Sequence, residues 1–317
     1  MTTSRIFTTP ARRYFSQWPL RAALLVAFLS TFCATARAET TTETLRFQDL
    51  QVIRHGEGRE LVFIPGLNSG YDAFAEVCQA LQPSVRCHLI NLPGFAGVSP
   101  LPQVEEGFLA RVTDQILSYI QHEALQNPVV VGHSLGGFTA LLLAKQQPSL
   151  FSGLVIVDSL PYFAAIQNPA ATPEQMRPMA EQMKKGMLSV SDQQYQRNLS
   201  MQLLGMTRDN ERMPQLTDWG LSSDRATTAQ AMYELQTMDL RPQLDTIKTP
   251  ALVVGAWAAY ENYGTTKDIA ANMFAAQYRL LPNKTIHISD GSYHFIMWDD
   301  REWLVDHINS FVDTLSK

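Results

Sequence analysis

Short apolar runs alternate with helix-like stretches along most of the chain. Strands are predicted at residues 45–53, 61–64, 85–92, 129–131, 154–157, 251–255 and 284–288. Helices are predicted at residues 71–81, 104–120, 135–147 and 266–276, and from about residue 301 onward. Strands that alternate with helices indicate βαβ units. The predicted fold class is therefore α/β, with a mostly parallel, doubly wound sheet covered by helices on both faces.

The alternation stops between residues 161 and 245, which contain helical segments and no β-branched run. Thr172, Pro173 and Gln175 are typical of a helix start, with a threonine cap, a proline in the first position and a glutamine three residues after the cap. Another helix is predicted over residues 222–238. We therefore expect a core formed by residues 39–160 and 246–317, interrupted by a helical cap or lid at residues 161–245.

Nine of the twelve methionines lie in this insertion. Four of them, Met176, Met179, Met183 and Met187, recur every three or four residues and form one stripe on a helix. This spacing favours packing of the insertion onto the core. Flexible, polarizable methionines also suit a surface that adapts to varied apolar ligands, and both interpretations hold if the insertion is a lid.

The first 38 residues differ from the rest in charge. They contain five arginines and no acidic residue, an apolar run at residues 22–29, and an A-x-A site at residues 36–38. These features predict a secretory signal peptide; the alternative is an uncleaved anchor, but the run is shorter than the ~20 residues that span a bilayer. Arg12 and Arg13 partly match a twin-arginine signal. We expect a periplasmic or secreted protein, exported by the ordinary or the twin-arginine route.

Composition narrows the possible functions. Loss of the signal segment would change the formal net charge from −5 to −10, so no basic excess is available to bind nucleic acid. Apolar residues make up 45% of the chain and charged residues 17%, which excludes general disorder. Two cysteines, Cys78 and Cys87, remain after the signal segment. Either a disulfide or two buried free thiols would fit, since sequence does not give the Cα separation that a bridge needs.

The strongest chemical signal is the sequence from Gly132 to Gly136, which has the G-x-S-x-G form with Ser134 at its centre. A predicted strand leads into it and a predicted helix leads out. Such a sharp strand-to-helix turn needs small residues around the serine and raises its hydroxyl above the sheet. The helix start behind the serine offers free N–H groups to a developing anion. This context predicts that Ser134 is a nucleophile.

With these residues the chain resembles the α/β-hydrolase fold family over nearly the whole mature sequence. The resemblance also includes the Pro65-Gly66-Leu67 turn, the loop at residues 91–99, the insertion at the family's cap position and a histidine near the C-terminus. It implies that His294, which lies between the last strand and the last helix, is the catalytic histidine. His133 is expected to pack or hydrogen-bond within the elbow, whereas His287 lies in a predicted strand and His307 in the last helix.

The triad acid is less clear from the sequence. The resemblance places it at position 258, which is Ala258 in this chain. Asp158, at the end of the strand after the nucleophile, is the first choice because active sites gather at the carboxyl ends of parallel strands. Glu261 is the second choice, and it would need a rearranged loop. Asp290 is nearer to His294 in sequence but is expected to face away.

The proposed chemistry is attack by Ser134 on an acyl carbonyl, with His294 as base and a carboxylate that orients it. The N–H groups of Leu67 and Leu135 are expected to form the oxyanion hole, with Asn68 as a further donor or as a turn former. No metal-ligand spacing or dinucleotide fingerprint is present, so no cofactor is implied.

The sequence therefore predicts an exported, carboxylesterase-like serine hydrolase that acts on a small, partly apolar acyl substrate. No nucleic acid partner and no stable membrane span after signal cleavage are expected, and the oligomeric state is left open. The alternatives are an amidase, lactonase, lipase or acyltransferase on the same fold, or a non-catalytic binding protein.

Overall fold

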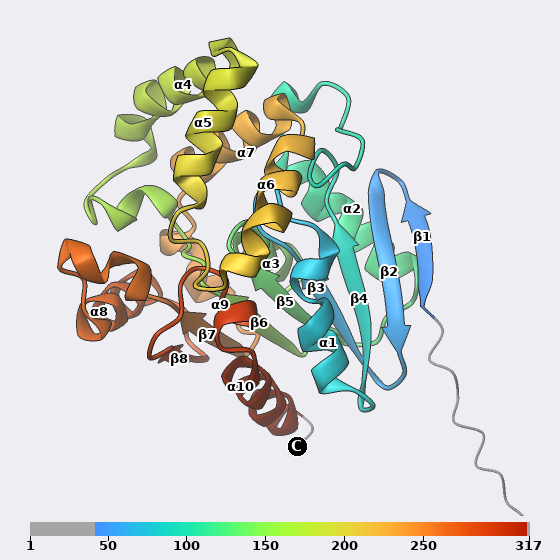
Figure 1. Cartoon of the computed structure of the whole chain (residues 1–317). Coiled ribbons are helices and arrows are strands. Elements are labelled where there is room, and N and C mark those ends of the chain that lie inside the picture. The colour runs from blue at the N-terminus through green and yellow to red at the C-terminus, as the bar shows by residue number, and fades with distance from the viewer. Residues whose placement is uncertain (1–41, 316–317) are drawn as a thin grey trace, which may run out of the picture. The chain divides into compact units, whose positions relative to one another are not determined.

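The computed structural model describes residues 42–315 (Figure 1), so the predicted signal segment lies outside the described residues. An eight-stranded sheet has the order β1-β2-β4-β3-β5-β6-β7-β8. Its strands are β1 (Glu43–Phe47), β2 (Leu50–Gly56), β3 (Arg59–Ile64), β4 (Val85–Asn91), β5 (Val129–His133), β6 (Gly153–Val157), β7 (Ala251–Gly255) and β8 (Lys284–Ile288). The β1–β2 and β2–β4 pairs are antiparallel, and every other pair of neighbouring strands in this order is parallel. The predicted α/β class with a mostly parallel sheet is confirmed.

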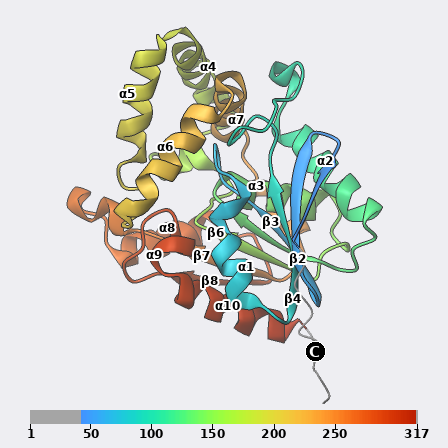
Figure 2. The same ribbon diagram turned by 45° about the vertical axis from the view of Figure 1, so that its right-hand side comes forward.

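Helices cover both faces of this sheet, as Figures 1 and 2 show. One face packs against α2 (Leu109–His122), α3 (Leu135–Gln146) and α8 (Lys267–Gln277). The other face packs against α1 (Ala75–Leu81), α9 (Ile296–Asp299) and α10 (Arg301–Thr314). Successive strand residues point to opposite faces, so that in β3 Leu61 packs with one helical layer and Val62 with the other. The central strands are consequently buried on both sides.

The N-terminal part of the sheet differs from the prediction. Residues 45–53 were expected to form one strand, but they form parts of β1 and β2, which pair as an antiparallel hairpin. The chain turns at Gln48, whose φ is 54°. Neither Gln48 nor Asp49 is the glycine or asparagine that usually marks a two-residue hairpin, so the turn lacks its common sequence signature.

Between β6 and β7 the described chain is helical and contains no strand. Its α-helices are α4 (Pro173–Ser189), α5 (Asp192–Leu203), α6 (Met213–Ser222) and α7 (Arg225–Thr237). The expected helix start is present, since Thr172 and Gln175 form a reciprocal capping box. In Figure 2 these helices lie together beyond one end of the sheet. We refer to residues 161–245 as the insertion.

The helix that carries the methionine stripe packs within the insertion. Helix α4 contacts α7, and Met176 lies against the small cluster around Tyr162. The side chains of Met176, Met183 and Met187 are only half-buried, and that of Met179 is 53% exposed. The stripe therefore does not form a fully buried core, because much of its apolar surface still meets solvent.

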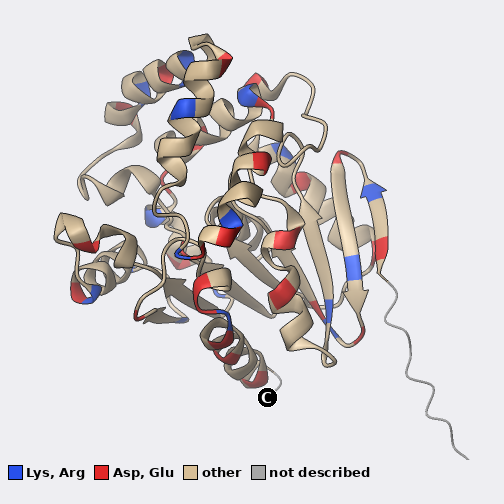
Figure 3. Cartoon of the chain, in the orientation of Figure 1, with Lys and Arg blue, Asp and Glu red and all other residues tan. Residues whose placement is uncertain are grey.

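Within residues 42–315 no helix combines the length and apolarity that crossing a bilayer requires. In the view of Figure 3 the basic residues are dispersed among acidic ones over both the sheet-covering helices and the insertion. This distribution offers no continuous basic face in that view, which agrees with the absence of a basic excess in the composition.

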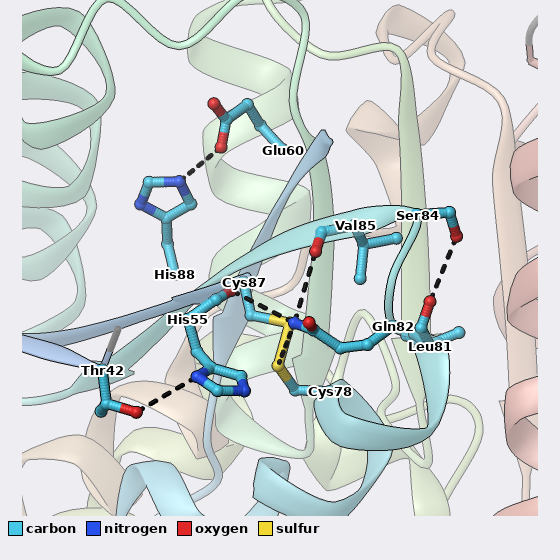
Figure 4. Close-up of a disulfide and its surroundings, with 10 residues drawn as sticks. All are labelled: Thr42, His55, Glu60, Cys78, Leu81, Gln82, Ser84, Val85, Cys87 and His88. Atoms are coloured by element: carbon cyan, nitrogen blue, oxygen red, sulfur yellow. Dashed lines mark hydrogen bonds and ion pairs between the residues drawn. A yellow bond between two sulfur atoms is a disulfide. The ribbon is translucent and has the colours of Figure 1, made fainter. Parts of the chain in front are cut away.

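Cys78 in α1 and Cys87 in β4 are joined by a disulfide (Figure 4). Both cysteines are buried, and the Gln82 side chain lies beside them and donates to the His55 carbonyl oxygen at 3.4 Å. The sequence allowed either a disulfide or two buried free thiols, and the structure contains the disulfide. It closes a short loop between a helix of one layer and a strand of the sheet.

Reduction of this bridge is expected to lower the free energy of unfolding by about 2–3 kcal/mol, because the unfolded chain regains the entropy of a loop of about ten residues. Urea unfolding with and without dithiothreitol measures the change. A Cys78→Ala/Cys87→Ala double variant is the control and should not respond to the reductant. Equal midpoints for the wild-type chain in both conditions would contradict the expectation.

Candidate active site

Ser134 lies at a strained turn between β5 and α3. Its φ of 53° and ψ of −119° fall outside the regions that non-glycine residues ordinarily occupy. The Ser134 N–H donates to the Val157 carbonyl oxygen at 3.0 Å, and the Ser134 carbonyl accepts from the N–H groups of Gly137 and Phe138. Strain of this kind costs on the order of 1–3 kcal/mol and persists where the surroundings hold it. These bonds fix the serine backbone from both sides, and its side chain is partly exposed.

The glycines of this turn are required by close backbone packing. A Cβ atom on Gly132 would lie 2.2 Å from the Gly136 carbonyl oxygen. A Cβ on Gly136 would lie 2.1 Å from the Ile64 carbonyl oxygen at the end of β3. Both distances are far inside van der Waals contact, so neither position tolerates a side chain. The same packing places the loop after β3 directly against the start of α3.

The proposed oxyanion donors occupy this junction. Leu135 is the first residue of α3, so its N–H has no carbonyl partner one turn earlier in the helix. A Cβ on Gly66 would lie 3.2 Å from the Ser134 Cβ, so the backbone leading into Leu67 passes close to the serine. The Asn68 side-chain oxygen accepts from the Thr228 hydroxyl at 2.6 Å, which ties this loop to α7 of the insertion.

His294 and Asp158 meet although they are far apart in sequence. His294 Nδ1 lies 2.6 Å from Asp158 Oδ2, and the two side chains are 27% and 16% exposed. Asp158 has a φ of 43° immediately after β6. Its other oxygen, Oδ1, accepts from the Ala256 N–H at 2.8 Å, in the loop after β7. The carboxylate therefore has one oxygen held by backbone and one directed at the imidazole.

The other positions considered for the triad acid do not contact His294. Ala258 and Glu261 both belong to the short 3-10 helix at residues 258–263. The Glu261 side chain is exposed, and within the described residues its carboxylate makes no hydrogen bond or ion pair. Asp290 is 92% exposed and pairs with Lys267 at 2.5 Å, so it faces away from His294 as expected. Of the candidates weighed, the structure brings only Asp158 to His294.

His133, which precedes Ser134 in the chain, contacts His294. The His133 ring contacts the His294 ring at a centroid distance of 4.4 Å and the Phe295 ring at 4.7 Å. His133 Nε2 lies 3.0 Å from the His294 carbonyl oxygen. Within residues 42–315 the Ser134 hydroxyl makes no hydrogen bond.

His133 is held in one neutral form. A carbonyl oxygen only accepts, so Nε2 carries the proton, while the buried Nδ1 has no hydrogen-bond partner among the described residues. Burial, with a smaller contribution from neighbouring His294, holds the pKa of His133 well below its usual range. The imidazole is therefore neutral at physiological pH, as a packing and hydrogen-bonding residue of the elbow should be.

This burial predicts a pH-dependent stability. The unfolded chain gains a proton on His133 below about pH 6.5 while the folded chain does not, so stability falls with decreasing pH until the lowered folded-state pKa is reached. Between pH 7.5 and 5.0 the loss attributable to this residue is no more than about 2 kcal/mol, the limit set by the unfolded-state pKa. Urea unfolding of wild-type and His133→Gln chains at both pH values measures it. Equal pH dependence in the two chains would contradict the expectation.

Sequence reasoning missed the backbone donor at Ala256. A peptide N–H has no residue-specific signature, so nothing in the sequence marks Ala256 as a partner of Asp158. The alanine at position 258, where the resemblance places the acid, indicated only that the acid lies elsewhere.

Comparisons with known proteins match most of the chain to one family. A family model described as alpha/beta hydrolase fold matches residues 60–301. Pimeloyl-[acyl-carrier protein] methyl ester esterases from Shewanella sp. (strain MR-7) and Aeromonas salmonicida are 29% and 30% identical to the chain. The alignments cover 64% and 65% of this chain and 74% and 79% of those proteins.

Solved structures show the same fold. An esterase from Exiguobacterium antarcticum has a TM-score of 0.70 at 17% identity, covering 86% of this chain and 100% of its own. An enol-lactonase from Burkholderia xenovorans LB400 has a TM-score of 0.65, also at 17% identity, and covers 86% of this chain and 100% of its own. An esterase and an enol-lactonase catalyse different reactions, so this likeness shows the fold alone and does not identify a substrate.

Proposed function

Because the chain belongs to the α/β-hydrolase fold family, we propose that it is an exported, carboxylesterase-like serine hydrolase that cleaves esters of small, partly apolar acyl compounds. The observation that carries this proposal is the 2.6 Å contact between His294 Nδ1 and Asp158 Oδ2, next to the strained turn that presents Ser134. Nucleophile, base and orienting acid are the three parts that an acyl-transfer triad needs.

The acyl-enzyme forms first. Neutral His294, with its proton on Nδ1 facing Asp158, accepts the Ser134 hydroxyl proton on Nε2 as the serine oxygen attacks the ester carbonyl. Asp158 remains ionised and stabilises the imidazolium that results. When the tetrahedral intermediate collapses, the ester C–O bond breaks and the imidazolium gives its proton to the departing alcohol. The acyl group is then bonded to Ser134.

Water completes the cycle in the same way. His294 takes a proton from the attacking water, the acyl–Ser134 bond breaks, and the proton returns to the serine oxygen. In both halves the negative oxygen would lie near the N–H groups of Leu135 and Leu67. Each donor of this kind is worth about 10²–10³ in rate, since it is already oriented before the charge develops.

An ester is favoured over the other acyl compounds by the relatives, whose names describe methyl ester esterases. The half-exposed methionines of the insertion support a partly apolar substrate, because flexible thioether side chains adapt to varied apolar shapes. On this reading residues 161–245 serve as the cap or lid. Ala258 was the one feature that favoured a non-catalytic binding protein, and the contact of Asp158 with His294 supplies the acid that Ala258 lacks.

Export is supported by two independent features. Residues 1–38 have the basic region, short apolar run and A-x-A site of a signal peptide. The disulfide between Cys78 and Cys87 is of a kind that persists in oxidising compartments such as the periplasm. We therefore propose a periplasmic or extracellular location for the mature chain.

Labelling with a fluorophosphonate probe tests the serine hydrolase proposal. The folded chain is expected to be labelled at one residue, Ser134, located by peptide mapping. A panel of p-nitrophenyl esters of increasing acyl length, with matched anilides and lactones, then tests the reaction class. Preference for esters is expected. A folded chain that is neither labelled nor active on any member of the panel would overturn the proposal.

A further inference from the structure

Asp299, the last residue of α9, binds two segments that are distant in sequence. Its Oδ1 accepts hydrogen bonds from the Thr207 hydroxyl at 2.6 Å and from the Arg208 N–H at 2.9 Å. Its Oδ2 accepts from the Tyr293 N–H at 2.7 Å. Thr207 and Arg208 belong to the insertion, between α5 and α6, whereas Tyr293 immediately precedes His294. One carboxylate thus joins the insertion to the loop that carries the proposed catalytic base.

Two further bonds connect the same segments. The Phe295 N–H donates to the Met206 carbonyl oxygen at 2.8 Å. The Arg208 side chain donates through Nη1 to the Gly291 carbonyl oxygen at 2.9 Å. The N–H of Tyr293, the residue before His294, is therefore bonded to Asp299. The N–H of Phe295, the residue after His294, is bonded to the backbone of the insertion. Thr207 is buried, so its bond to Asp299 is shielded from water.

We propose that Asp299 is a positioning residue that couples the placement of the insertion to the placement of His294. This inference rests on the proposed function, because it assigns His294 the role of base. Hydrogen bonds to an ionised carboxylate are about twice as strong as neutral ones. Donors from both segments set the orientation of this carboxylate, so loss of the insertion-side donors changes how it holds Tyr293. Movement of residues 206–208 would then displace His294 from Ser134 and Asp158.

Kinetics of Asp299→Asn test this coupling. The amide keeps only one acceptor oxygen, so either Tyr293 or the Thr207–Arg208 pair loses its partner. We expect kcat per titrated active site on a p-nitrophenyl ester to fall about 10- to 100-fold, since a displacement of 1 Å can cost 10²-fold. KM should stay within about twofold, because no substrate contact is removed. Glu302→Gln removes the same charge from an exposed site in α10 and is the matched control.

Thr207→Val separates coupling from a purely local effect. It removes the insertion-side hydroxyl, which also accepts from the Asp209 N–H at 3.1 Å, and it keeps the side-chain shape. We expect a fall in kcat per site of about 2- to 10-fold. In the double variant the two effects should be less than additive, because both act through one carboxylate. Wild-type kcat in Thr207→Val would overturn the coupling. Active-site titration of Asp299→Asn could instead show fewer functional active sites with an unchanged kcat per site. That result would show a merely structural role and would overturn the proposed positioning role of Asp299.

Amide hydrogen exchange tests the same inference without turnover. The Phe295 amide bonds to Met206 and not to Asp299, so it reports whether residues 206–208 stay docked. In Asp299→Ala we expect faster exchange at Tyr293, Arg208 and Phe295, and in Thr207→Val faster exchange at Arg208 and Phe295. Unchanged exchange at Phe295 in both variants would contradict the coupling. An inactive wild-type chain would refute the esterase proposal, but the exchange rates would still show whether Asp299 couples the insertion to the His294 loop.

Discussion

Replacement of Ser134 by alanine is expected to lower kcat for ester hydrolysis by about 10⁴- to 10⁶-fold. The variant lacks the only oxygen at the turn that can attack the carbonyl, while the oxyanion donors and the binding surface remain. Alanine keeps the Cβ of serine, so the strained backbone at φ 53° should be retained. Initial rates on the best p-nitrophenyl ester, together with loss of fluorophosphonate labelling, measure the effect.

Ser310→Ala is the control for this variant, since Ser310 is exposed on α10 and distant in sequence from the elbow. Its rate and labelling should equal those of the wild-type chain. Thermal unfolding should show that both variants are folded. A Ser134→Ala chain that keeps more than about a tenth of the wild-type rate would show that another group is the nucleophile.

Asp158→Asn is expected to lower kcat by about 10⁴-fold through the tautomer of His294. Ala256 N–H needs an acceptor, so the oxygen of the asparagine side chain should keep that bond and its NH₂ group should face His294 Nδ1. An NH₂ donor requires an unprotonated Nδ1 and thus moves the imidazole proton to Nε2. The nitrogen facing Ser134 then cannot accept the hydroxyl proton.

Glu261→Gln makes the same change of carboxylate to amide in the competing candidate. Glu261 is exposed and has no hydrogen-bonding or ionic partner within residues 42–315, so its variant should keep the wild-type kcat. Comparison of the two variants under one set of conditions distinguishes the candidates. Near-wild-type activity in Asp158→Asn, or a large loss in Glu261→Gln, would remove Asp158 from the mechanism.

Much of the fold was predictable because its signals are local. Buried central strands such as β5 and β7 are continuous β-branched or apolar runs. Helix α4 begins at a capping box that is formed by residues within four consecutive positions. The β1–β2 hairpin was missed because its turn at Gln48 lacks the usual residues. The methionine stripe was predicted as a helix face, but its degree of burial depends on α7, a partner that periodicity does not identify.

The sequence by itself determined the elbow around Ser134, since the steric demands of that turn act within five consecutive residues. Through the resemblance to the α/β-hydrolase fold family, it also led to His294 as the proposed base. The tertiary structure decided which carboxylate meets His294, whether Cys78 and Cys87 are joined, and which insertion residues hold the His294 loop. These contacts join residues from separate elements, and they exist only because strands and loops from distant parts of the chain converge. Local propensity carries no information about that convergence, because the partners of a side chain are set by packing and not by its neighbours in sequence.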